Sequence, residues 1–224
     1  MISPVNTKTA AALALSATLL LTSADVARAQ QGAVESHVRR VLTEAPDTPE
    51  GQGYLALAAA DAAVAIRHAE LAANDDTNLE WMQTHARHVL HALDPSLVEQ
   101  VGPASGYGLQ PAANQIARHI GLAADSEGAS GAVETHASRV IAASNAVAAR
   151  AEELADVAQQ VLEAGDYSSA GGRMYDLRRL ARGLQSGLDA DEDGQISFEP
   201  PEGGLDHVRQ HAELMAEAAG VSLD

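Results

Sequence analysis

Apolar residues at intervals of seven give the strongest structural signal in this sequence. Val133, Val140, Val147, Leu154 and Val161 follow one another at this spacing, and no proline or glycine interrupts them. An apolar period of seven places these side chains along one stripe of an α-helix, which must be buried against other helices. The segment therefore predicts a long helix within a helical bundle.

Helical periodicity and turn signals divide the rest of the chain in the same way. The predicted helices span 31–45, 51–73, 77–93, 109–125, 129–164, 170–188 and 203–219. The chain is 46% hydrophobic but only 3% aromatic, which excludes wholesale disorder and argues against a β-sandwich or barrel. We predict an all-α fold, an antiparallel bundle of about seven helices built from duplicated helical hairpins, in one domain at 30–224.

Residues 1–29 have the pattern of a secretory signal peptide. Lys8 precedes a largely apolar stretch at 10–22, and Ala27 and Ala29 form a small-x-small cleavage site. No later segment reaches the length of about 18 apolar residues that a membrane span needs. We therefore expect a cleaved leader and a periplasmic or secreted protein without a membrane span.

The charge balance limits the partners that this chain can bind. Acidic residues outnumber Lys and Arg by 31 to 14, the net charge is −17, and there is no cysteine. Such acidity disfavours nucleic acid and anionic membranes and favours cationic partners, of which metal ions are the simplest. The absence of cysteine excludes disulfides, thiolate ligands and thiol nucleophiles.

Two helical hairpins of the sequence resemble each other. Residues 66–74 (IRHAELAAN) match residues 117–125 (ARHIGLAAD), and residues 85–90 (HARHVL) match 37–42 (HVRRVL) and 136–141 (HASRVI). His68 and His85 are 17 residues apart, as are His119 and His136, and a short predicted turn lies between the members of each pair. Equal distances from a turn place both histidines at a similar height in an antiparallel hairpin.

Six of the nine histidines share one local pattern, with apolar residues three before, one after and four after the histidine. These positions surround a helical residue on one face, so the pattern places each histidine on or beside the buried stripe. We predict that the six share one layer of the bundle, with an opening where Gly183 takes the histidine position in 180–184. The six are His37, His68, His85, His119, His136 and His211.

Two interpretations of these histidines compete. They are either core residues satisfied by their neighbours, repeated through duplication, or ligands of a transition metal such as Zn, Cu or Fe, or of the iron of haem b. His207 and His211 also form an i, i+4 pair able to chelate an ion. His88 and His91 fall outside the pattern and are expected to be more exposed, and Asp61 is a candidate carboxylate partner for His68.

An acidic segment near the C-terminus carries the most specific motif. Residues 189–199 (DADEDGQISFE) place carboxylates at loop positions 1, 3 and 5 and glycine at position 6. The segment resembles the calcium loop of EF-hand proteins, which implies Ca²⁺ as the ligand. At position 12 the bidentate glutamate of that family is replaced by Pro200, and Glu199 or Glu202 is the candidate substitute. The ligands implied by the resemblance over 189–202 are Asp189, Asp191, Asp193, Gln195, Ser197, Glu199 and Glu202.

These features favour a non-enzymatic function. The sequence has no nucleophile triad, glycine-rich phosphate loop or paired-carboxylate motif. We expect a secreted or periplasmic metal-binding protein that holds calcium at the acidic loop and a transition metal at the histidine layer. The alternatives are a protein that binds haem non-covalently for electron transfer or sensing, and a structural or interaction module stabilised by calcium.

Overall fold

The computed structural model describes residues 23–75, 77–99 and 102–223, with side chains described from residue 32 onward. Most of the predicted leader, 1–22, lies outside the described residues, and 23–29 form the start of the first helix. Within the described residues no helix is long and apolar enough to cross a membrane.

The described chain is all-α, as the sequence predicts, with no extended sheet. The long helices are α1 (Ser23–Leu42), α2 (Tyr54–Ala72), α3 (Leu79–Leu93), α4 (Leu109–Ala124), α5 (Gly131–Glu163), α7 (Met174–Ser186) and α8 (Leu205–Ala218). The short helix α6 (Tyr167–Gly171) and two 3₁₀ turns, Pro49–Gly51 and Pro95–Leu97, lie in the connections. The seven helices expected from the sequence are confirmed, and most of their ends differ from the prediction by one to three residues.

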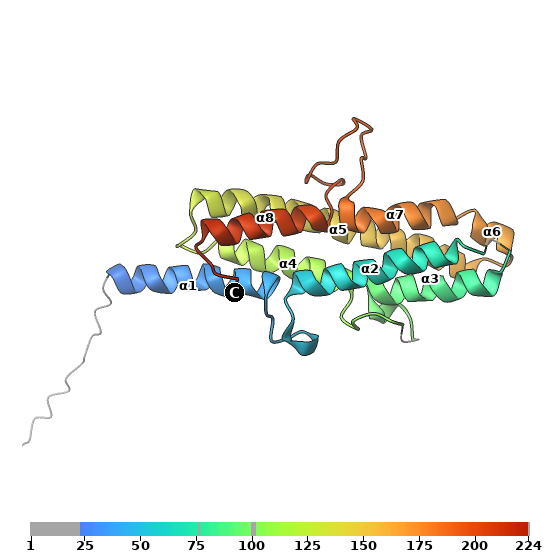
Figure 1. Ribbon diagram of the computed structural model, residues 1–224, viewed down its shortest axis with the longest axis horizontal. Helices are drawn as coiled ribbons and strands as arrows, with labels where there is room; N and C mark the ends of the chain where they lie inside the picture. The colour runs from blue at the N-terminus through green and yellow to red at the C-terminus, as the bar shows by residue number, and fades with distance from the viewer. Residues whose placement is uncertain (1–22, 76, 100–101, 224) are drawn as a thin grey trace, which may run out of the picture.

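In the part of the chain that the structure describes, the helices form antiparallel rods, and the rod formed by α5 is continuous (Figure 1). The other rods are α1 followed by α2, α3 followed by α4, and α7 followed by α8, each interrupted near the middle of the bundle by a loop. With 33 residues, α5 is about 50 Å long and spans both halves. One half packs α4 and α8 on α5, and the other packs α3 and α7 on it.

The buried stripe of α5 is the one predicted from the interval of seven. Val133, Val140, Val147, Leu154 and Val161 are each at most 1% exposed. The helices that pack on α5 bury larger apolar side chains such as Leu90, Ile116 and Leu177 together with alanines, which let backbones approach closely but bury little apolar area per residue. The helix α2, which packs on α3, α4 and α7, is rich in buried alanine, with Ala58, Ala62, Ala65, Ala69 and Ala72 all fully buried.

The prediction of a single histidine layer is wrong. His68 and His85 flank the turn between α2 and α3, whereas His119 and His136 flank the turn between α4 and α5. Figure 1 shows these two turns at opposite ends of the bundle. The repeat fixes the height of each histidine relative to its own turn, but the two hairpins point in opposite directions along the bundle.

Candidate metal centres

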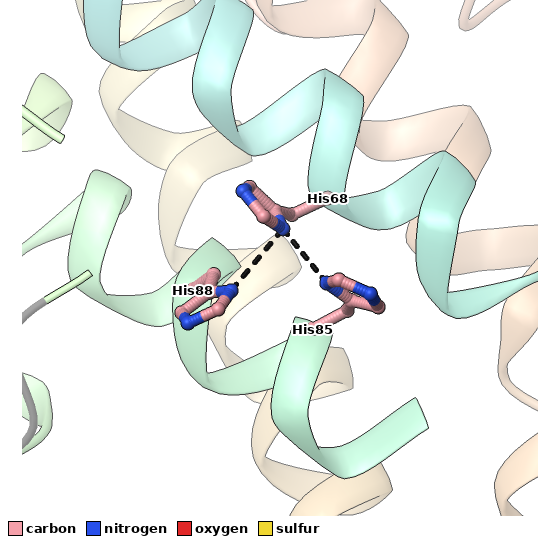
Figure 2. Close-up of side chains that lie close together, drawn as sticks. All are labelled: His68, His85 and His88. Carbon is pink, nitrogen blue, oxygen red and sulfur yellow. Dashed lines mark hydrogen bonds between the residues drawn. The ribbon is translucent and has the colours of Figure 1, made fainter. Parts of the chain in front are cut away.

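Three histidines meet between α2 and α3. The Nδ1 atom of His68 lies 2.8 Å from Nδ1 of His85 and 3.2 Å from Nδ1 of His88. Figure 2 shows the ring of His68 on α2 directed at the two rings on α3. Each residue offers a ligand atom, and these three atoms lie within 4.8 Å of one another. The site is a triad of imidazoles with no carboxylate in it.

Local helix geometry assembles this triad. His85 and His88 are three residues apart on α3 and therefore share a helix face. Fully buried alanines at 65, 69 and 86 bring α2 and α3 close enough for His68 to reach them. Trp81 packs edge-on against the His85 ring, with ring centroids 4.3 Å apart, and its Nε1–H donates to the Leu71 carbonyl oxygen at 2.7 Å.

The three Nδ1 atoms cannot all be satisfied by linear hydrogen bonds among themselves. A ring nitrogen holds either one proton or one lone pair in the ring plane, so it makes one such bond. Nδ1 of His68 faces two other Nδ1 atoms at hydrogen-bond distance. An ion at the point of convergence would accept all three lone pairs at once.

Burial keeps these imidazoles neutral. Desolvation, with the charges of His88, His85 and Arg67, lowers the pKa of His68 to about 4. Desolvation also lowers the pKa of His85 and of His88. At neutral pH the three side chains are therefore deprotonated, which is the form that ligates a metal.

Two expectations about the surroundings of the triad are wrong. Asp61 is not a partner of His68, because its carboxylate accepts hydrogen bonds from Ser105 N–H at 2.8 Å, Ser105 Oγ–H at 2.6 Å and Gly108 N–H at 3.1 Å. Asp61 thereby holds the loop before α4. His88, expected to be exposed and apart, is half-buried and belongs to the triad.

Two buried histidine nitrogens beside this site lack a partner in the described chain. His91 is only 4% exposed, contrary to the exposure predicted from its position outside the pattern, and its Nδ1 has no partner. The Nε2 atom of His85 is likewise buried without one. Sequence reasoning missed His88 and His91 because it asked only for apolar neighbours at fixed offsets.

The other patterned histidines form two separate pairs. Nδ1 of His37 on α1 lies 3.0 Å from Nδ1 of His119 on α4, and Nδ1 of His136 on α5 lies 3.3 Å from Nδ1 of His211 on α8. Nδ1 of His207 does not form a chelate with His211, because this atom accepts a hydrogen bond from Gly204 N–H at 3.3 Å.

The acidic loop projects from the bundle between α7 and α8 (Figure 1). Carboxylate oxygens of Asp189, Asp191 and Asp193 lie within 4.8 Å of one another. Gly194 adopts a φ of 84°, and its N–H donates to Asp189 at 2.9 Å. Three of the seven ligands implied by the EF-hand resemblance are thus brought together, with glycine in the left-handed conformation that the sharp turn requires.

Glu202 connects the two sides of this loop. One carboxylate oxygen accepts from Ala190 N–H at 3.1 Å and the other from Ser197 N–H at 2.9 Å, so the side chain ties the two sides of the loop together. The hydrogen bonds from Ser197, followed by that from Ala190, lower the pKa of Glu202 to about 2. The hydroxyl of Ser197 accepts from Glu199 N–H at 3.2 Å, and neither Glu199 nor Glu202 belongs to the aspartate group.

Arg150, which sequence reasoning did not single out, anchors the base of the loop. Its guanidinium is buried and donates to the carbonyl oxygens of Gly183 at 2.7 Å, Gly203 at 2.9 Å and Glu202 at 3.1 Å, and also to that of Pro201. Burial lowers the pKa of Arg150 to about 10. A charged residue between Val147 and Leu154, on the apolar stripe, is the signal that could have revealed it.

The predicted opening at Gly183 is filled. A Cβ atom built on Gly183 would lie 2.5 Å from Cγ of Leu188 and 2.9 Å from Cδ of Arg150. The small residue at this position makes room for the loop anchor, and no histidine-sized space remains.

No protein-family model, curated protein or solved structure matches this chain.

Proposed function

We propose that this protein binds a transition-metal ion at His68, His85 and His88. The observation that carries the proposal is the convergence of three Nδ1 atoms, at 2.8 and 3.2 Å from the shared His68. Two ligand nitrogens about 2 Å from one ion stand about 2.8 Å apart at a right angle and about 3.3 Å apart at the tetrahedral angle. The observed separations match this range.

The ligand set indicates the class of ion. Three neutral imidazoles without thiolate or carboxylate suit Zn²⁺, Cu²⁺ or Ni²⁺ and are poor ligands for Ca²⁺ or Mg²⁺. Three protein ligands also leave a coordination position for water or an exchanging ligand. Such a site suits storage, buffering or transport of the ion, and the predicted leader at 1–29 supports a periplasmic or secreted location.

The spacing of the nitrogens favours an ion over haem. Two axial imidazoles on opposite faces of a haem iron stand about 4 Å apart, twice a metal–nitrogen bond of about 2 Å. The Nδ1 atoms of the triad are closer than that. A haem would also need a flat cavity between the two rings, whereas here α2 and α3 pack directly on each other.

Titration of metal-free protein with zinc chloride tests the proposal. We expect a tight site that is lost in the double variant His68→Gln and His88→Gln. Because burial lowers the pKa of all three imidazoles, to about 4 for His68, zinc should stay bound below pH 6.5 and be released as the pH falls toward about 4. His207→Gln is the matched control, since Nδ1 of His207 is engaged by a backbone N–H. Unchanged zinc affinity in the double variant would contradict the proposal.

We further propose that the acidic loop binds calcium in a structural role. The support is the aspartate group, the left-handed Gly194 and the resemblance of the motif. Because Glu202 braces the loop instead of joining the aspartates, we expect weak affinity, with a Kd of about 10⁻⁴–10⁻³ M. Calorimetry should show one calcium site that disappears when Asp189→Ala and Asp193→Ala are combined. Heat of binding that persists in this variant would contradict the assignment.

A further inference from the structure

The Nδ1-to-Nδ1 contact of the triad recurs twice elsewhere in the bundle. His37 and His119 meet at 3.0 Å, and His136 and His211 meet at 3.3 Å. In each pair one ring is buried and the other is half-buried, and the two rings come from different helices. These separations fall in the same range of about 2.8–3.3 Å that two nitrogens on one ion require.

The Nε2 atoms of these four rings are compatible with metal ligation through Nδ1. A ring that binds an ion through Nδ1 carries its proton on Nε2, and that N–H needs water or another acceptor. Among the described residues, none of the four Nε2 atoms is buried without a partner, in contrast to Nε2 of His85. Ligation at the pairs therefore leaves no orphaned donor behind.

An aromatic ring and a positive charge lie near each pair. The ring of Tyr54 stacks on His119 with centroids 5.4 Å apart, and the ring of Phe198 meets His211 edge-on at 5.6 Å. The charges of Arg40 and Arg118 act on His37 and His119, and that of Arg139 acts on His211; Arg40 is itself paired with Asp47 at 2.9 Å. In each pair an aromatic ring thus contacts the buried histidine.

We propose that His37 with His119, and His136 with His211, are two further transition-metal centres, each completed by water. This inference rests on the proposed function, because the pairs are two-ligand versions of the same site. The chain then takes up three ions, the triad binding most tightly because it supplies three imidazoles and each pair only two. An ion at a pair also links helices, joining α1 to α4 or α5 to α8.

Copper(II) chloride is the probe that tests the number and composition of the centres. Metal-free protein is loaded with Cu²⁺, passed through a desalting column and assayed for copper per chain, and electron paramagnetic resonance counts the nitrogens bound to each ion. We expect three ions in the wild type. His37→Gln and His136→Gln, which alter the half-buried ring of each pair, should each remove one ion, and His207→Gln should remove none.

The outcomes separate the inference from the proposed function. One retained ion that is lost in the variant combining His68→Gln and His88→Gln would overturn the two extra centres and leave the triad intact. If all three centres exist, the variant combining His68→Gln and His88→Gln should retain two copper ions. A copper content equal to that of the wild type in this variant would contradict metal binding at the triad. If a variant fails to fold, as judged by circular dichroism, the wild-type ion count and the two-nitrogen copper signals decide the question.

Discussion

The buried His68 should make the stability of the metal-free protein depend on pH in a way that one substitution removes. Its pKa is lowered from 6.5 to about 4, first by desolvation and then by the charges of His88 and His85. A histidine with a lowered folded-state pKa binds its proton more weakly in the native than in the unfolded state. Its contribution to stability is therefore complete above pH 6.5 and is lost as the pH falls toward about 4.

The size of this effect follows from the shift itself. One pKa unit corresponds to about 1.4 kcal/mol, so a fall from 6.5 to about 4 corresponds to about 3 kcal/mol. Most of that loss should occur above about pH 4.5, before the folded-state pKa is reached. His68 is 8% exposed, so solvent screening reduces the effect only modestly.

Urea denaturation in the presence of a chelator measures the effect. The free energy of unfolding is determined from about pH 7.5 to about pH 4.5 for the wild type and for His68→Gln, which retains a polar side chain without a proton to gain. Because carboxylates and other histidines contribute equally to both proteins, the difference between the two curves isolates His68 and its coupling to His85 and His88. Parallel curves over this range would refute the argument that burial holds the triad neutral.

Two further substitutions test how the loop is seated on α5. Gly183→Ala should destabilise the protein by about 1–3 kcal/mol, because its Cβ would overlap Leu188 and Arg150. The control Gly121→Ala on α4, where the nearest contact is 3.9 Å away, should stabilise the protein by up to about 1 kcal/mol. Thermal unfolding in which both substitutions change the stability in the same direction would contradict this. Arg150→Met should lower the free energy of unfolding by about 2–4 kcal/mol, since buried carbonyl oxygens lose a charged donor, and a urea midpoint equal to that of the wild type would show that the anchor is not needed.

The sequence was sufficient to predict the helices because their signals are local. The stripe from Val133 to Val161 depends on spacing along one segment, and turn residues mark the ends of the helices. The same information indicates which face of a helix a histidine occupies and the similar heights of His68 and His85, whose rings meet. It does not identify the partner, because His119 and His136 have the same spacing but contact His37 and His211 instead.

Long-range placement could not be predicted in this way. The layer failed because nothing local to the repeats reveals that the α2–α3 and α4–α5 turns point to opposite ends of the bundle. His88 joins the triad only because α2 approaches α3 at the height of His68. The role of Arg150 depends on the fold in the same way, because its guanidinium donates to the carbonyl oxygens of Gly183 and Gly203 at the two ends of the loop. Both depend on contacts between segments distant in sequence.

Calcium binding at the acidic loop should change the environment of one histidine pair and leave that of the triad unchanged. Phe198, in the loop, contacts the ring of His211 and lies under the guanidinium of Arg139, 5.1 Å from its ring centroid, so a change in loop structure passes directly to the pair of His211 with His136. The triad lies beside the α2–α3 turn, and no described hydrogen bond or ring contact joins it to the loop. Ring proton resonances of His211 should therefore shift when calcium chloride is added to metal-free protein, while those of His68 stay within experimental error. Equal shifts at both sites would show a global rearrangement, and no shift at His211 would show that Phe198 does not report on the state of the loop.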